Sequence, residues 1–291
     1  MDWQVTAMDE AVVARFVRDD GAELIADETD WGLTKIEGAD APKLQVFTED
    51  NAVGDGSTVT GKMVSERDLQ IEAEVMDAAQ NDALRWRATE FFNPKRTYKV
   101  YLTYMGRTRW IEGELSAFKA PTGYIHDKQS FSAYFLCPNP YWQSVDDFGQ
   151  DIASETARWG WPYMDNPDYG VLVSYYNYDR KVVFNYPGDV PAYPSAILQA
   201  EGQVTNPKLI KDDAYIRILD TMEAGDVIEI VFFPYVRVRK NGENILNKVD
   251  RTSNFAGMQM QPGINTVSYA ADFGDNSLHV ILRYNNQYLG V

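Results

Sequence analysis

Two pairs of carboxylates have a spacing that could support acid–base chemistry. Glu72 and Glu74 lie two positions apart in one extended stretch, and Glu112 and Glu114 repeat this spacing in another. Residues two apart on a strand share one face, so each pair would present two carboxyl groups together, as a glycosidase requires. The same spacing is typical of a solvated strand face. The alternation with apolar residues favours the solvated face.

Other residues that commonly carry chemistry are scarce. The chain has two histidines, His126 and His279, which limits histidine-based catalysis and metal binding. Its single cysteine, Cys137, excludes an internal disulfide and agrees with a reducing compartment. We therefore predict no enzymatic activity, no catalytic residue, no metal site and no cofactor.

Two loops contain residues that could hold a ligand. The stretch 165–168, Asp-Asn-Pro-Asp, could offer oxygens to calcium, but a turn built on an Asx-Pro pair has the same composition, and we favour the turn. The polar loop 48–62 contains Gly54, Asp55, Gly56 and Gly61. It lacks the Gly-Lys-Ser/Thr ending of a phosphate loop and the oxygen spacing of a calcium loop. Because it is too long for a simple turn, we interpret it as a hairpin arm that reaches a neighbouring subunit.

Composition excludes several classes of protein. The 291 residues fit two domains, and the net charge of −16, from 43 acids and 27 bases, is unfavourable for gripping nucleic acid or an anionic membrane. No apolar run approaches the roughly 18 residues of a membrane span. The N-terminus is acidic where a signal peptide would be basic. We expect the protein to be made and kept in a cytoplasm unless an assembly carries it out.

The stretch 131–144, FSAYFLCPNPYWQS, predicts a domain junction. It begins as a strand and then meets two prolines, which cannot donate to a ladder and end the strand. A proline-rich loop inside a single domain is the alternative. We predict domains 1–140 and 141–291, with 141–169 an irregular connecting segment, and a hinge made of Cys137, Pro138, Asn139, Pro140, Tyr141 and Trp142.

The first half reads as a β-rich domain with one helix. The range 67–75 alternates apolar and polar residues and predicts a strand. A helix is expected from Asp77, a good N-cap, to Phe92, where Asn93-Pro94 ends it. Further strands are expected at 11–17, 23–26, 44–47, 96–104, 107–119 and 130–137.

The second half shows short, evenly spaced strands and no helical period, which favours a β-sandwich. Strands are expected at 171–175, 182–186, 196–200, 215–219, 227–232, 237–240, 266–269 and 278–283, with Asn241-Gly242 as a hairpin turn. Aromatic residues are dense in its early part, and exposed aromatic rings can stack on sugars. Core or interface positions are the alternative for Tyr175, Tyr176, Tyr178, Phe184, Tyr186 and Tyr193.

Several short stretches occur in an order that resembles the distal tail proteins of long-tailed bacteriophages. In the first half these are 31–33, 36–38, 54–56, Gly61 and 67–71. At the junction the resemblance rests on Cys-Pro-Asn-Pro-Tyr-Trp, residues 137–142. In the second half it rests on 185–189 with Pro194, Gly202 with 206–207, 224–226 and 261–265.

The resemblance implies a structural virion protein at the distal end of a phage tail, assembled in the host cytoplasm. It implies a β-barrel-like first domain with one helix, six copies of which form a ring below the tail tube, and a galectin-like β-sandwich that projects outward. The implied partners are the tail tube protein, the tail-tip protein and receptor-binding proteins. The family brings no catalytic residues, and the galectin sugar motif His-x-Asn-x-Arg is absent here.

Three functions remain open at this point. The first is the hub role, which an acidic chain suits because a basic channel wall would hold the phosphates of DNA. The second is a carbohydrate- or receptor-binding tail protein that acts through the second half. The third is a glycan hydrolase that uses Glu72 or Glu112.

Overall fold

The computed structural model describes residues 12–122, 128–145, 148–151, 154–157, 174–177 and 180–291. The chain divides into two compact units. The first unit contains Met1–Val145 together with Gln287–Val291, and the second contains Asp146–Asn286. The last residues of the chain therefore belong to the first unit. The predicted division after residue 140 does not include this return of the chain.

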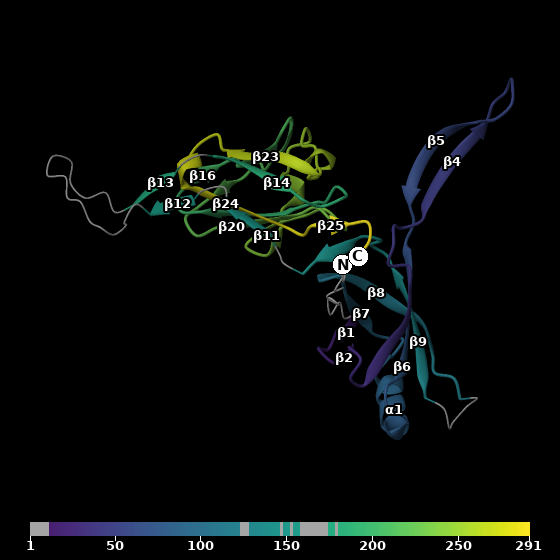
Figure 1. The fold of residues 1–291 in the computed structure, drawn as a ribbon. Coiled ribbons are helices and arrows are strands. Elements are labelled where there is room, and N and C mark those ends of the chain that lie inside the picture. Colours follow the sequence, from purple (N-terminus) through teal and green to yellow (C-terminus); the bar gives the residue numbers. More distant parts are fainter. Residues whose placement is uncertain (1–11, 123–127, 146–147, 152–153, 158–173, 178–179) are drawn as a thin grey trace, which may run out of the picture. The chain divides into compact units, whose positions relative to one another are not determined.

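A nine-stranded sheet forms the frame of the first unit (Figure 1). Its main path runs in the order β2-β1-β7-β8-β9-β6-β3, and β10 joins β8 to β25. Among the described residues the path has two ends, β2 and β3. The sheet is therefore open, and the expected barrel-like closure is not observed. The bounds are β1 Val13–Arg18, β2 Glu23–Ala26, β3 Trp31–Glu37, β6 Arg67–Val75, β7 Thr97–Tyr104, β8 Arg107–Lys119, β9 Ser130–Cys137, β10 Trp142–Ser144 and β25 Gln287–Tyr288.

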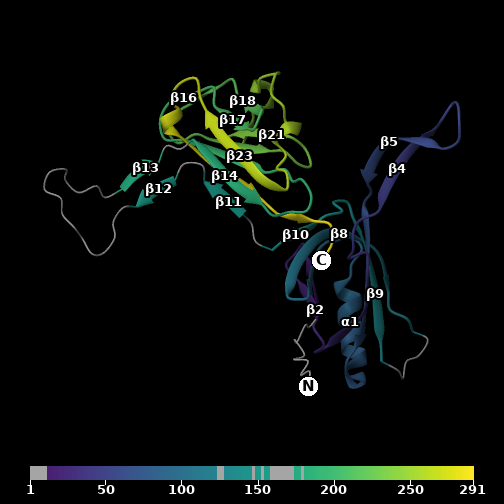
Figure 2. The ribbon, with the colours of Figure 1, turned by 45° about the horizontal axis from the view of Figure 1, so that its top comes forward.

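One helix, α1 (Asn81–Phe91), packs on this sheet (Figure 2). It follows a 3-10 turn, Ala78–Gln80, where the Asp77 carboxylate accepts the Ala79 N–H at 3.0 Å as predicted for a cap. The helix buries a stripe of Leu84, Ala88 and Phe91. At its C-terminal end, the Tyr98 hydroxyl donates to the Phe91 carbonyl (2.9 Å) and accepts the Asn93 N–H (2.6 Å). The helix end is thus fixed by a strand residue, and the mainly β domain with one helix is confirmed.

Aromatic rings fill the space between α1 and the sheet. The Phe92 ring lies 5.3 Å from Phe16 and 5.1 Å from Phe131, centroid to centroid, and Phe16 stacks on Phe135 at 5.9 Å. Each of these side chains is at least nine-tenths buried. Burying a ring of this size stabilises a fold by roughly 1.5–3 kcal/mol, so this cluster is a main source of stability for the unit.

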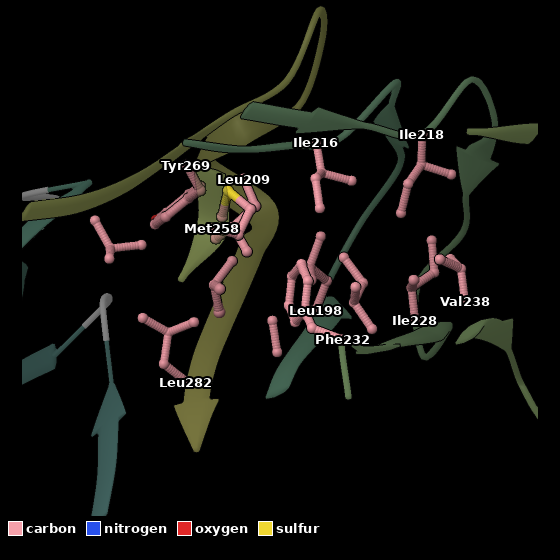
Figure 3. Close-up of a cluster of buried hydrophobic side chains, with 14 of the residues drawn as sticks. Leu198, Leu209, Ile216, Ile218, Ile228, Phe232, Val238, Met258, Tyr269 and Leu282 are labelled. Atoms are coloured by element: carbon pink, nitrogen blue, oxygen red, sulfur yellow. The ribbon is translucent and has the colours of Figure 1, made fainter. Parts of the chain in front are cut away.

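The second unit is a sandwich of two sheets. A six-stranded sheet has the order β11-β24-β15-β20-β21-β22, and a four-stranded sheet has the order β14-β23-β17-β18. In Figure 3, Leu209, Ile216 and Tyr269 of the second sheet face Leu198, Ile228 and Leu282 of the first across one buried cluster. Because alternate residues of each strand point into this cluster, the predicted period of two is observed.

The strands of the second unit are short, as expected. They are β11 Phe148–Asp151, β12 Ser154–Ala157, β13 Ser174–Asn177, β14 Lys181–Tyr186, β15 Ser195–Ala200, β16 Val204–Thr205, β17 Lys208–Lys211, β18 Ala214–Arg217, β19 Thr221–Met222, β20 Val227–Val231, β21 Arg237–Lys240, β22 Glu243–Asn244, β23 Gly263–Ala270 and β24 Leu278–Tyr284. β12 pairs with β13, and β16 with β19, as separate two-stranded ladders. Strands β10, β11 and β12 lie in the segment that was expected to be irregular, so that expectation is wrong there.

The second unit is inserted between two adjacent strands of the first. Trp142 in β10 pairs with Tyr288 in β25, and Gln143 pairs with Gln287. The chain leaves the first unit after Val145 and returns at Gln287. A cut after residue 144 therefore removes β25 and leaves one edge of β10 without its partner.

This topology predicts that the first unit needs its returning strand. A chain of residues 1–145 joined to 287–291 through a four-residue Gly-Ser turn should melt at least about 5–10 °C above a fragment that ends at Val145. The reason is that the fragment leaves buried donors unsatisfied, which costs about 1–3 kcal/mol each. Calorimetry or circular dichroism measures the difference. Equal melting temperatures would show that β25 contributes nothing.

Candidate functional site

The most exposed secondary structure in the described part of the chain is a hairpin, here named the arm (residues 43–65). It consists of β4 (Leu44–Asp50) and β5 (Ser57–Val64), which pair with each other and with no other described strand. All of β4 and most of β5 are exposed. Figure 1 shows the arm standing clear of the sheet of its unit. An isolated two-stranded hairpin is marginally stable in water, so a contact with another molecule would stabilise it.

The tip of the arm is an ordered turn. The Asn51 N–H donates to the Gly56 carbonyl at 3.1 Å, and the Thr58 hydroxyl donates to the Asn51 side-chain oxygen at 2.8 Å. Gly54 and Gly56 have φ values of +98° and +93°, which only glycine adopts without strain. The stretch 48–62 contains strand residues at both ends, so it is not a loop throughout, and the predicted hairpin arm agrees with this geometry. The contact of the arm with a neighbouring subunit stays a prediction.

The arm carries apolar side chains on both faces. By register, Leu44 is opposite Val64, Val46 is opposite Lys62, and Thr48 is opposite Val59. Cross-strand partners share a face, and a bulge after Phe47 keeps that face continuous. We name it the arm face: Leu44, Val46, Thr48, Asp50, Ser57, Val59, Lys62 and Val64. Leu44, Val46 and Val59 are 54%, 45% and 52% exposed.

The residues of the predicted junction, 137–142, are arranged as follows. β9 ends at Cys137, before the two prolines as predicted, and the Asn139 side chain accepts the Tyr141 N–H at 3.2 Å. Trp142 is fully buried in the core of the first unit. Burial raises the pKa of the Cys137 thiol to about 12, so this cysteine is unreactive at neutral pH.

A buried arginine holds the junction together. Arg67 is 3% exposed, and its guanidinium donates only to backbone carbonyls. Nε donates to Pro140 and Nη2 to Leu289, both at 2.7 Å, and Nη1 donates to Gly38 and Asp40. Desolvation lowers the pKa of Arg67. One side chain thereby joins the loop after β3, the junction and the returning C-terminal segment.

Two further contacts fix the C-terminal segment. The Arg109 guanidinium lies 3.7 Å above the Tyr288 ring and donates to the Gly290 carbonyl. The Val291 N–H donates to the Ala39 carbonyl at 3.2 Å. Gly38, beside this contact, cannot be replaced, because a Cβ there would lie 2.0 Å from the Asp68 carbonyl oxygen. These contacts tie the junction to the first unit, and its role as a hinge stays a prediction.

The paired glutamates lie on the polar face of the sheet. Glu72 and Glu74 are half-buried and Glu112 and Glu114 exposed, all on the side of the sheet away from the core. Glu74 lies 3.8 Å from Lys128, and Glu114 accepts the Thr97 hydroxyl at 2.9 Å. β9 separates their two strands. This arrangement is that of a solvated polar face.

The second unit contains a charged cluster that is neutral as a set. Lys240 Nζ lies 2.9 Å from Asp226 and 3.7 Å from Asp220, and Lys248 lies 3.0 Å from Asp220. Two ammonium groups thus balance two carboxylates, which leaves no charge for a cation. Within the described residues, no group of three or more metal-ligating side chains occurs.

The remaining residues that the sequence analysis singled out lie outside these sites. Phe184 and Tyr186 are buried in the sandwich core, and Tyr193 stacks on Phe232. Tyr178, residues 165–168 and His126 lie outside the described residues, as do the side chains of Tyr175 and Tyr176. His279 lies on β24. Among the described residues of this unit, the exposed aromatics are instead Phe233, Tyr235 and Phe273, which sequence reasoning did not single out.

Comparison with known proteins adds three findings. Residues 187–288 match the family model described as Siphovirus-type tail component, C-terminal domain. The fold matches the crystal structure of the SPP1 Dit protein, whose description reads "a Paradigm of Hub Adsorption Apparatus in Gram-positive Infecting Phages", with a TM-score of 0.64 at 13% identity over 94% of this chain and 98% of that one. It also matches a chain of the phage P2 baseplate in its activated conformation with Ca, with a TM-score of 0.50 at 8% identity over 94% and 97%.

The predicted resemblance to the distal tail (Dit) proteins is confirmed. No curated protein sequence matches the chain. At these identities the structural matches show a Dit-like fold, and the family match supports a structural tail protein of the hub or baseplate type. In the described part of this Dit-like chain, no helix has the length and apolar character to cross a membrane.

Arg67 gives the first prediction from this site. Arg67→Ala should lower the free energy of unfolding by about 3 kcal/mol, because it leaves several buried carbonyls without donors. Arg67→Lys should recover only part of this, since one ammonium cannot reach all four carbonyls. Denaturant unfolding measures both. The matched control is Arg107→Ala, at an exposed position of β8, which should change stability little. An equally small effect of Arg67→Ala would contradict the role of Arg67 in joining these segments.

Asp226 predicts a loss of stability in acid. The Lys240 ammonium, the Glu223 N–H and the Asn241 amide all bond its carboxylate and lower its pKa to about 2. Because the pKa in the unfolded chain is about 4, this stabilisation is present above pH 4 and is lost as the pH falls from about 4 to 2.

Asp226→Asn should therefore destabilise the protein at pH 7, and the difference from the unchanged protein should shrink as the pH approaches 2. Denaturant midpoints at pH 7, 4 and 2.5 give the comparison. Asp213→Asn, at an exposed turn, serves as the control. A difference that stays constant with pH would count against this assignment.

Proposed function

We propose that this protein is a distal tail hub whose first unit forms a closed ring, of six copies, that connects the tail tube to the tail-tip and receptor-binding proteins. The observation that carries the proposal is the Siphovirus-type tail component match combined with a Dit-like fold over nearly the whole chain. The number six comes from the resemblance to distal tail proteins.

The arm supplies the physical support. A ring requires heterologous contacts, in which one surface of each copy meets a different surface of the next. The first unit provides a rigid sheet with an aromatic core and an exposed apolar hairpin that no other strand of the described chain covers. A second copy offers identical partners at fixed stoichiometry, so each arm would be covered once in a closed ring.

The proposal assigns the remaining features as follows. The chain leaves the proposed ring-forming unit after Val145, just beyond the junction Cys137–Trp142, and enters a unit that we propose to be a galectin-like projecting part. The net charge of −16 favours a channel along which DNA moves without binding. No enzymatic activity is assigned, because the paired glutamates lie on a polar sheet face. Carbohydrate or receptor binding by the second unit stays a prediction, to be tested on glycan arrays.

The ring predicts a discrete assembly that depends on the arm. Purified protein should show a closed ring by negative-stain microscopy, and a mass of six chains by light scattering at high concentration or beside its tube protein. Replacing residues 45–63 by a two-residue Asn-Gly turn should leave a folded monomer, because the core of the unit is untouched.

The matched point variants are Val59→Asp in the arm and Val183→Asp in the second unit, with similar exposures of 52% and 57%. Only Val59→Asp should prevent assembly. A protein that stays monomeric at high concentration and beside its tube partner would refute the ring.

A further inference from the structure

The helix α1 exposes a tryptophan that its own unit does not use. Trp86 is 74% exposed, whereas the core stripe of the helix is Leu84, Ala88 and Phe91. Tryptophan is enriched among residues that dominate the energy of interfaces, because its large ring buries much apolar area. An exposed ring of this size on a regular helix is therefore a candidate anchor for a partner.

Acidic residues flank this tryptophan along the helix. Asp82 precedes it by four positions and Glu90 follows it by four, and all three side chains are exposed. Residues four apart lie on one stripe of a helix. Within the described residues, no ion pair involves the carboxylate of Asp82 or Glu90. We name Asp82, Trp86 and Glu90 the helix stripe. It presents one apolar ring between two negative charges.

The arm face has the complementary chemistry. It places one lysine, Lys62, among Leu44, Val46, Val59 and Val64, and its acidic residue, Asp50, lies at the tip of the arm. Lys62 is exposed and forms no ion pair with any described residue. Apolar side chains of the arm face can cover the Trp86 ring while the Lys62 ammonium meets the Glu90 carboxylate at one end of the helix stripe. Complementary charges at the rim of an apolar contact fix register and exclude wrong partners.

The positions of the two surfaces fit a contact between copies. Figures 1 and 2 show the arm and α1 at opposite ends of the first unit. Surfaces at opposite ends of one rigid body cannot meet within a chain, but each can meet its complement on another copy, head to tail. Every copy would then donate one arm and accept one.

We propose that the arm face of one copy docks on the helix stripe of the next, with Trp86 as the anchor and Lys62 paired with Glu90. This inference rests on the proposed ring and specifies its joint. It commits to a second copy as the occupant of the stripe. A tube or tip protein on the same stripe is an outcome that the test below distinguishes.

Directional cross-linking tests the joint. The chain is suited to it because its one cysteine, Cys137, is fully buried and has a raised pKa. Protein with Lys62→Cys is mixed with protein carrying Glu90→Cys under mild oxidation. A covalent dimer should form in the mixture and not in either protein alone. Cross-linking by one protein alone, or none in a mixture that assembles, would overturn the proposal.

Substitutions give an independent measurement. Trp86→Ala should raise the concentration for half-assembly by about tenfold or more, whereas the control Tyr235→Ala, at an aromatic residue 77% exposed in the other unit, should leave it unchanged. Lys62→Glu alone and Glu90→Lys alone should each weaken assembly, and their combination should restore it.

The outcomes separate the two proposals. If removal of the arm abolishes the ring while Trp86→Ala and the cysteine mixture have no effect, the ring stands and the helix stripe is refuted as its joint. If Trp86→Ala instead abolishes capture of the tube protein and leaves self-assembly intact, the stripe serves a different partner and the joint is likewise refuted. A protein that never self-associates refutes both.

Discussion

The burial of one guanidinium is the constraint on which the first unit depends. Among the described residues Arg67 has no ion-pair partner, so backbone carbonyls, together with the Trp142 ring 5.8 Å from the guanidinium carbon, compensate for its lost hydration. Those carbonyls come from the loop after β3, from the junction and from the C-terminal segment. Because removing any one of them leaves a buried donor unsatisfied, the three segments stabilise one another. The return of the chain at Gln287 is therefore part of the first unit's fold.

In this arrangement the two units are stabilised by separate sets of contacts. The second unit enters and leaves through adjacent strands, β10 and β25, which the Arg67 and Arg109 contacts hold in the first sheet. Its own core, around Leu198, Ile216 and Ile228, contains residues of that unit alone. A change in the inserted unit then has little effect on the sheet that carries it. In the proposed hub, such independence would allow the second unit to vary while the proposed ring-forming unit is kept.

Local patterns predicted much of the fold and little of the assembly surface. The strand at 67–75, the helix cap at Asp77 and the Asn241-Gly242 turn all follow from neighbours in sequence, and the structure contains them. β25 is two residues long and pairs with a strand more than a hundred residues away, so no local sequence pattern predicts it. The role of Arg67 was hidden for the same reason. Trp86 could have been recognised, because its position falls off the stripe of Leu84, Ala88 and Phe91.

The proposed contact would also account for the apolar area that the arm and the helix stripe expose. Each exposes apolar area that the folded chain alone leaves in water, and in the proposed contact both surfaces would lose that exposure together. A hairpin of two strands gains too little from its own ladder to be firmly stable, whereas the sheet that anchors it is fixed by a buried core. Assembly would therefore order the arm and bury Trp86 in one step. Closure then becomes cooperative, because each copy that joins stabilises the arm of its neighbour.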